Sequence, residues 1–209
     1  MSQFDLLNIA ATSIATPSSW VSSVFVDTDK KLKVKDDAWS VNSYKYNYST
    51  ASQAPVAVTR TYITGSALAI WATKLQVGSK FRWTMNMTKT AAGIAASTFD
   101  ICFGTAWTTA DTARVSFTKP AGTAVIDEGT IVINCIIRSI GATWVAVWQF
   151  NMTHNLAATW HALIPNVNVN TISAGFDMTV ANLIVWVCVT SWASDALTFQ
   201  YVEAEAWNV

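Results

Sequence analysis

Apolar and polar residues alternate along much of the chain. In residues 80–88 (KFRWTMNMT) every second side chain is apolar: Phe81, Trp83, Met85 and Met87. A period of two is typical of a half-buried β-strand. Further alternating runs predict strands at residues 98–103 (TFDICF), 114–118 (RVSFT) and 196–203 (ALTFQYVE). Two runs are apolar on both faces at their centres, which indicates central strands: residues 129–138 (GTIVINCIIR) and 182–190 (NLIVWVCVT).

Residues 141–155 (GATWVAVWQFNMTHN) predict one more strand, with an unusually aromatic face. Its apolar face consists of Trp144, Ala146, Trp148, Phe150 and Met152, and its other face carries Thr143, Gln149, Asn151 and Thr153. The pattern leaves open whether Trp144 and Trp148 meet a second sheet of the same chain or a neighbouring subunit.

A short motif occurs twice. Residues 83–88 (WTMNMT) and 148–153 (WQFNMT) share the order Trp, any residue, apolar residue, Asn, Met, Thr. We therefore expect two equivalent strands with equivalent ends. Each of them should place Trp, the apolar residue and Met on one face, and Asn and Thr on the other.

Turn signals separate the predicted strands, among them residues 92–93, 119–122, 127–129 and 191–195. The polar stretch 165–177 alternates Val and Ile with Asn and Thr, so it is a candidate edge strand. Strands at intervals of about ten to twenty residues are typical of sandwiches. We predict an all-β protein, an antiparallel β-sandwich with jelly-roll-like topology.

The N-terminal part differs from the rest. Residues 22–34 (SSVFVDTDKKLKV) predict a hairpin with a charged turn, and nearby aspartates balance its lysines, which favours a solvated hairpin over an anion site. Residues 44–54 (YKYNYSTASQA) are small and polar and are interpreted as a linker. The sequence thus predicts an arm and hairpin at 1–55, acting as an attachment region, and a β-sandwich domain at 56–209.

The composition favours protein partners over nucleic acid or membrane. The chain is 52% hydrophobic and only 12% charged, whereas soluble domains carry about 25% charged residues. So little charge indicates extensive contact with other protein chains. A formal net charge of zero argues against nucleic-acid binding. The longest strongly apolar run, 183–189, is far shorter than the roughly 20 residues of a membrane-spanning helix, so we expect no membrane insertion.

Candidate chemistry is sparse. The three cysteines (Cys102, Cys135 and Cys188) lie in apolar alternating runs without metal-ligand spacing, which predicts buried free thiols. The two histidines, His154 and His161, are too few for a zinc site. We therefore expect neither a metal nor another cofactor.

Catalytic motifs are not found either. The sequence contains no P-loop, GxGxxG, GxSxG or HExxH. Glu203 and Glu205 fall on one face of a single strand, whereas a glycosidase needs carboxylates that face each other across a cleft. We expect a protein that is not an enzyme.

Tryptophan is the strongest anomaly, with 11 residues in the chain. The candidates for a subunit interface or for stacking against a ligand are Trp107, Trp144, Trp148, Trp160 and Trp192. Trp107, Trp160 and Trp192 fall in predicted loops, where they can stack on sugar rings or fill a subunit interface. The low charge of the chain favours the interface.

Several phrases of the sequence resemble structural proteins of tailed bacteriophages. They are residues 75–93 (LQVGSKFRWTMNMTKTAAG), 103–122, 138–158, 176–189 and 197–208 (LTFQYVEAEAWN), and residues 24–38 (VFVDTDKKLKVKDDA) resemble a virion module. The resemblance implies a component of the virion, a trimeric β-sandwich that decorates the capsid or forms part of a fibre. Its expected partners are copies of itself and the major capsid or other virion proteins. The alternative function is a carbohydrate- or receptor-binding module that contacts a glycan of the host surface.

Overall fold

The computed structural model describes residues 10, 13–18, 23–26, 32–35, 41–70, 75–91, 94–119, 121, 123–154, 167–172, 177, 183–191 and 197–209. For residues 32, 41–43 and 167–172 it describes the backbone only. The described residues contain no α-helix, and none of their segments is a helix long and apolar enough to cross a membrane.

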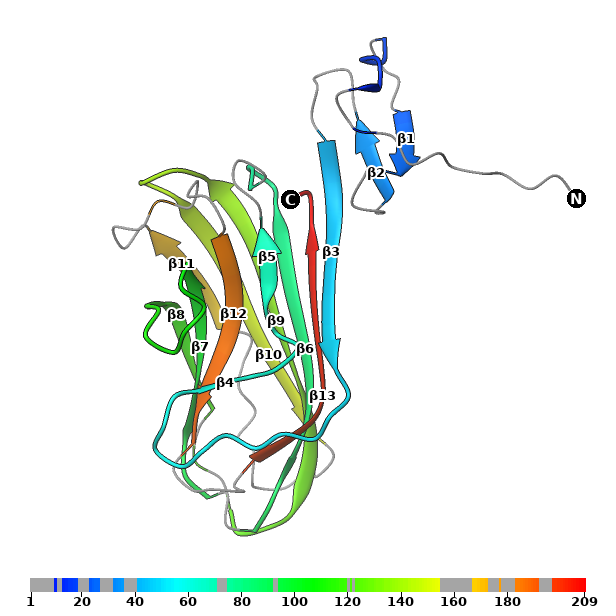
Figure 1. The fold of residues 1–209 in the computed structure, drawn as a ribbon. Coiled ribbons are helices and arrows are strands. Elements are labelled where there is room, and N and C mark those ends of the chain that lie inside the picture. The colour runs from blue at the N-terminus through cyan, green and yellow to red at the C-terminus, as the bar shows by residue number, and fades with distance from the viewer. Residues whose placement is uncertain are drawn as a thin grey trace, which may run out of the picture.

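Two β-sheets face each other (Figure 1). The larger sheet has eight strands in the order β1-β2-β3-β13-β6-β9-β10-β11. Their bounds are Ser23–Val26 (β1), Leu32–Lys35 (β2), Val41–Ser49 (β3), Leu197–Trp207 (β13), Lys80–Lys89 (β6), Asp127–Ser139 (β9), Val145–His154 (β10) and Val167–Ile172 (β11). The smaller sheet, β4-β12-β7-β8, comprises Thr61–Tyr62 (β4), Leu183–Thr190 (β12), Ser97–Gly104 (β7) and Ala113–Lys119 (β8), and β5 (Leu68–Ile70) also pairs with β12.

Each pairing between these strands is antiparallel. The expected all-β sandwich is therefore confirmed, whereas the jelly-roll-like order of its strands stays a prediction. The strands predicted from alternation are also found, and β11 lies at the sheet edge within the stretch 165–177 that was a candidate edge strand.

The repeated motif forms the centre of the core. Trp83 of β6 and Trp148 of β10 lie on strands that both pair with β9, and their rings stack with centroids 6.4 Å apart. Met87 and Met152, the methionines of the two motifs, are buried on the same side of the sheet. The two segments are therefore equivalent strands, as expected.

A buried charged layer lies where β6 and β8 end. Lys89 and Lys119 both point inward, and Asp127 is paired in register with Lys89 and is also buried. The Lys89 ammonium donates hydrogen bonds to the carbonyl oxygens of Thr123 and Val125. Burial, together with the charge of Lys89, lowers the pKa of Lys119 to about 8. This end of the sandwich is therefore polar, unlike the aromatic centre.

The interpretation of residues 44–54 as a linker is wrong. Residues 41–49 form β3, which pairs with β2 on one side and with β13 on the other. The hairpin β1–β2 thus stands beyond one end of the sandwich, joined to it through β3 (Figure 1). The division between residues 1–55 and 56–209 stays a prediction.

The hairpin lysines are not all solvated, contrary to expectation. Lys33 and Lys35 are buried, and the Lys35 ammonium donates a hydrogen bond to the Ile14 carbonyl oxygen at 2.6 Å. Long lysine side chains can bury their stems while the charged end reaches a polar partner. Lys30 and Lys31 lie outside the described residues.

Candidate functional site

The outer face of the larger sheet carries a row of exposed tyrosines on β3. Tyr44, Tyr46 and Tyr48 alternate with side chains that point to the other side of the strand, and they are 40%, 46% and 56% exposed. Their rings follow one another with centroids 6.3 Å and 5.6 Å apart. Aromatic side chains contribute most when they are buried in a core or an interface, so three exposed rings in a row are an unusual surface feature.

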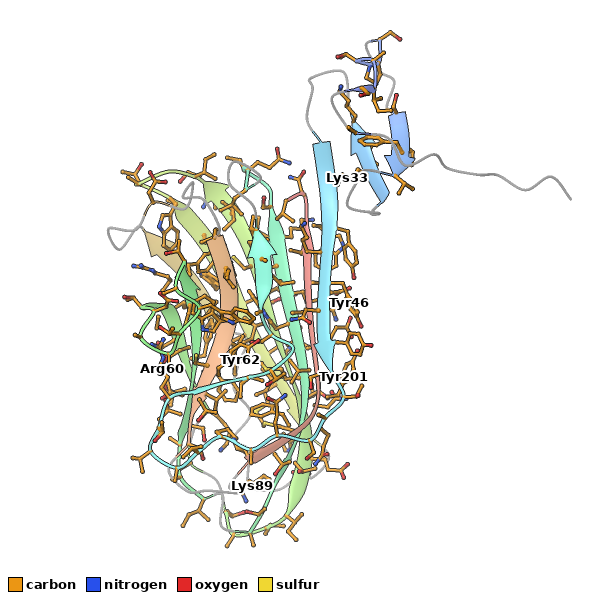
Figure 2. All side chains as sticks on the ribbon, viewed as in Figure 1. Lys33, Tyr46, Arg60, Tyr62, Lys89 and Tyr201 are labelled. Atoms are coloured by element: carbon orange, nitrogen blue, oxygen red, sulfur yellow. The ribbon has the colours of Figure 1, made fainter. Side chains whose placement is uncertain are left out.

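Strand β13 completes this surface. Its residues Val202, Ala204 and Ala206 are buried, so the residues between them face outward beside the tyrosines. Trp207 is paired in register with Tyr44, Glu205 with Tyr46, and Glu203 with Tyr48. We call the resulting surface the aromatic strip; it consists of Tyr44, Tyr46, Tyr48, Tyr201, Glu203, Glu205 and Trp207. Figure 2 shows Tyr46 and Tyr201 pointing away from the smaller sheet.

Hydrogen bonds link the carboxylates of the strip to its tyrosines. The Tyr44 hydroxyl donates to Glu205 Oε1 at 2.6 Å, and the Tyr201 hydroxyl donates to Glu203 Oε2 at 2.7 Å. The Tyr44 ring is also tilted against Trp207, with centroids 5.8 Å apart. These contacts fix the orientation of the rings and carboxylates.

The same contacts perturb the tyrosine hydroxyls. Burial, and then the hydrogen bond with Glu205 and its charge, raise the pKa of Tyr44 well above its usual value. The pKa of Tyr201 is raised by its hydrogen bonds with Tyr46 and then Glu203. Both hydroxyls therefore remain protonated donors at neutral pH.

Two grooves hollow the same outer face. The first, with a volume of about 560 Å³, is bounded by Asn86, Thr130 and Thr153 on β6, β9 and β10. We call it the Thr130 groove. It lies next to the strip because Asn86 is paired in register with Tyr201.

The second groove, with a volume of about 800 Å³, includes Trp207 of the strip itself, together with Lys80 and Arg82 of β6. We call it the Trp207 groove. Asn86, Thr88 and Thr153 of the repeated motif therefore line one groove, and Trp207 of the aromatic strip lines the other.

Trp107 lies elsewhere, on the side of the smaller sheet. It is 55% exposed, and its backbone has a left-handed φ of 53°. Its ring meets Tyr62 edge-on, with centroids 6.2 Å apart. A left-handed conformation is strained for a tryptophan, so the surrounding loop must hold it in place.

Arg60 provides that support. Its guanidinium pairs with Asp100 at 2.9 Å and donates hydrogen bonds to the carbonyl oxygens of Thr109 (2.9 Å) and Asp111 (2.6 Å). Gly104 allows the loop to approach, because a Cβ there would lie 2.4 Å from the Asp111 carboxylate. Trp107 is thus an exposed aromatic residue on a loop that Arg60 holds in place, and it is separate from the aromatic strip.

The other tryptophans that the sequence singled out are not on the surface that the structure describes. Trp144 and Trp148 are fully buried, and Phe103 of the smaller sheet stacks on Trp144 at 6.1 Å and meets Trp148 edge-on at 5.7 Å. Of the two possibilities left open by the sequence, the structure therefore places them against a second sheet of their own chain. Trp160 and Trp192 lie outside the described residues.

The cysteines are free and buried, as predicted. Burial raises the pKa of Cys135, and a hydrogen bond with Cys188 together with burial raises that of Cys102. Within the ranges that the structure describes, no three His, Cys, Asp or Glu side chains form a group that could hold a metal ion.

Sequence reasoning missed the tyrosines of the strip and Trp207. The available signal was the alternation Tyr-Lys-Tyr-Asn-Tyr at residues 44–48. It was obscured because the alternate positions are polar: Lys45, Asn47 and Ser49. The inward Asn47 is satisfied by a hydrogen bond from its amide to the Ala67 carbonyl oxygen at 2.8 Å.

Comparisons with known proteins gave likenesses among solved structures only. No protein-family model and no curated protein matches the chain. Among solved structures, it is similar to the CBM2 module of the evolved Dit of Lactobacillus casei BL23 phage J-1, with 9% sequence identity and a TM-score of 0.36. The likeness covers 79% of this chain and 98% of that one.

Proposed function

We propose that this protein is a non-enzymatic, glycan-binding β-sandwich and that the aromatic strip receives the sugar. The observation that carries the proposal is the row of exposed Tyr44, Tyr46 and Tyr48 beside two carboxylates. A pyranose ring has an apolar face of C–H groups and a rim of hydroxyls. The first packs on aromatic rings and the second bonds to polar groups.

The hydrogen bonds within the strip suit such a ligand. Each carboxylate accepts a tyrosine hydroxyl on one oxygen. An ionised carboxylate offers about four lone-pair sites, so Glu203 and Glu205 keep acceptor capacity for sugar hydroxyls. Their orientation is set in advance, which reduces the entropy lost on binding.

A subunit interface fits the strip less well. The centres of protein interfaces are depleted in charged residues, because burying a charge without a full set of partners is costly. The strip has Glu203 and Glu205 among its aromatic rings. This favours a hydrated, polyhydroxylated ligand over a second copy of the chain, although the low overall charge of the sequence favours interfaces in general.

The two glutamates support binding rather than hydrolysis. They are neighbours on β13 and face the same way, so they do not enclose a glycosidic bond between them. Each is also engaged by a tyrosine hydroxyl. The proposal therefore includes the absence of catalytic activity, and a hydrolysis screen with Glu203→Gln as the control tests it.

The proposal further places the protein on a phage particle, as the quoted sequence phrases suggest. A glycan-binding sandwich on a virion would contact the host surface, while residues 1–55 attach it to capsid or other virion proteins. We also propose that the chain associates with itself, as the homotrimer that the sequence resemblance implies. Mass spectrometry of purified particles tests the location, and light scattering of the purified chain tests the oligomeric state.

A glycan array tests the binding proposal. The purified protein should bind at least one glycan, and Tyr46→Ala should weaken that binding by about tenfold or more because a stacking surface is lost. The matched control is Trp107→Ala, which removes an exposed aromatic ring outside the strip and should leave binding unchanged. Loss of binding in Trp107→Ala alone would place the sugar on the Trp107 loop. Binding to no glycan would reject the function, and a change of oligomeric state in Tyr46→Ala would identify the strip as a subunit interface.

A further inference from the structure

The Trp207 groove differs in chemistry from the rest of the aromatic strip. Two cationic side chains, Lys80 and Arg82, line it from β6. Lys80 is paired in register with Trp207, and Arg82 with Glu205. Positive charge, an indole ring and a hollow of about 800 Å³ therefore occur together at one end of the strip.

These two cations have no partner among the residues that the structure describes. Neither Lys80 nor Arg82 forms an ion pair or side-chain hydrogen bond with any residue that the structure describes. Glu205 is the carboxylate in register with Arg82, but it accepts the Tyr44 hydroxyl from β3, on the opposite side of β13. The tyrosine contact thus engages the carboxylate on the side away from the guanidinium.

Amide side chains complete the lining of the groove. Asn134 and Gln149 come from β9 and β10, and the Asn134 amide donates to Gln149 Oε1 at 3.2 Å. Asn208 follows Trp207, and its Oδ1 accepts a hydrogen bond from Gln76 at 2.6 Å. Each of these amides retains a further donor or acceptor position.

We propose that the Trp207 groove binds an anionic sugar residue of the glycan, with its carboxylate or phosphate against Arg82 and Lys80 and its ring against Trp207. This inference rests on the proposed function and specifies the ligand class. A guanidinium matches the planar pair of oxygens of a carboxylate or phosphate, and lysine adds a point charge. The amides then bond to the hydroxyls of the same sugar.

A nucleic acid is a poorer occupant of this groove. Phosphate-backbone binding requires an extended basic surface, whereas the chain has 13 basic and 13 acidic residues. Glu203 and Glu205 adjoin the groove along the strip and would repel a continuous polyanion. A glycan that carries its negative charge on a single residue avoids this repulsion.

The test is an array of matched glycan pairs that differ only in one anionic group. The pairs are glycans with one terminal galacturonate and their methyl esters, glycans with one terminal sialic acid and their carboxyl methyl esters, and mannose oligomers with and without one phosphate group. The wild-type chain should bind the anionic member of one pair about tenfold or more tightly. The pair that responds distinguishes carboxylate from phosphate.

Two variants complete the experiment. Arg82→Gln should reduce the difference between the members of the responding pair at least severalfold, because it should weaken binding of the anionic member more than binding of the neutral member. Arg138→Gln removes an exposed cation of β9 that is not among the residues lining the groove, and it should preserve the difference.

Two results would overturn the inference while leaving the proposed function intact. One is equal or weaker binding of the anionic member in every pair, and the other is an equal loss of preference in the two variants. Binding to neither member of any pair overturns the inference together with the proposed function.

Discussion

At the residue scale, the two tryptophans of the repeated motif differ in one hydrogen bond. Trp83 Nε1 donates to the Ser66 carbonyl oxygen at 2.8 Å. Trp148 Nε1 is buried without a hydrogen-bond partner among the described residues. Both side chains are fully buried and stack on each other. The motif is therefore equivalent in packing but not in polar contacts.

This difference predicts unequal costs for the same substitution. Trp83→Phe breaks a buried hydrogen bond and leaves the Ser66 carbonyl oxygen short of a donor. Trp148→Phe removes an indole N–H that has no partner in the part of the chain that the structure describes. We expect Trp83→Phe to lower the free energy of unfolding by about 1 kcal/mol more than Trp148→Phe. Urea denaturation of the two variants measures the difference. Equal losses of unfolding free energy in the two variants would show that the hydrogen bond of Trp83 adds nothing to stability beyond ring packing.

The buried Lys119 predicts a pH dependence of stability. Its pKa is lowered to about 8 in the folded chain, first by burial and then by Lys89, and is about 10.4 when unfolded. Below pH 8 both states hold the proton. Between pH 8 and about 10.4 the unfolded state holds more protons, so the free energy of unfolding increases with pH.

We expect a gain on the order of 1 kcal/mol between pH 8 and 9.5, before tyrosine ionisation contributes. Lys119→Met should reduce this gain, and Lys80→Met, at an exposed position, should not. Because burial also lowers the pKa of Lys89, part of the gain should persist in Lys119→Met. Denaturation curves across this pH range provide the measurement, and a flat or falling stability in the wild-type chain would contradict the pKa shift.

At the element scale, β3 packs closely against the turn between the two short strands that follow it, β4 and β5. Gly65 lies in the turn between β4 and β5 and has a left-handed φ of 88°. A Cβ at this position would lie 2.5 Å from the Ser49 nitrogen and 2.6 Å from the Tyr48 carbonyl carbon. The turn therefore packs directly behind Tyr48 of the aromatic strip.

Gly65→Ala should destabilise the protein by about 3 kcal/mol or more, since left-handed strain adds to a backbone clash. Gly141→Ala is the matched control: its φ is 91°, but a Cβ there meets nothing within 4 Å. We expect it to cost about 1–2 kcal/mol from strain alone. Thermal or urea unfolding compares the two variants, and similar losses would mean that the chain relaxes around the Gly65 contact at little cost.

The elements differ in how well the sequence predicts them. Strands such as β6 and β10 alternate large apolar and polar side chains, so their extents follow from the local pattern. Strand β3 reverses the usual arrangement, with tyrosines outside and Lys45, Asn47 and Ser49 inside. The inward face of β3 is polar, and its outward face carries tyrosines, which have both an aromatic ring and a hydroxyl. Without a run of purely apolar side chains, the segment has the composition of a linker.

At the scale of the whole molecule, a sandwich is predictable from the sequence, but the candidate site is not. Alternation and turn signals indicate two packed sheets. The aromatic strip requires that β3, near the N-terminus, pairs with β13 at the C-terminus, and the Trp207 groove requires β6, β9 and β10 beside them. Such pairings join segments far apart in the chain, and no local pattern specifies them.

The central claim is that sugars bind on the aromatic strip, and the most direct test maps the contact. The glycan that binds best on the array is titrated into isotope-labelled protein, and NMR shift changes are recorded residue by residue. We predict saturable changes at Tyr44, Tyr46, Tyr48, Tyr201 and Trp207, with the Trp107 loop unaffected. Changes confined to the Trp107 loop, or to the smaller sheet, would contradict the account.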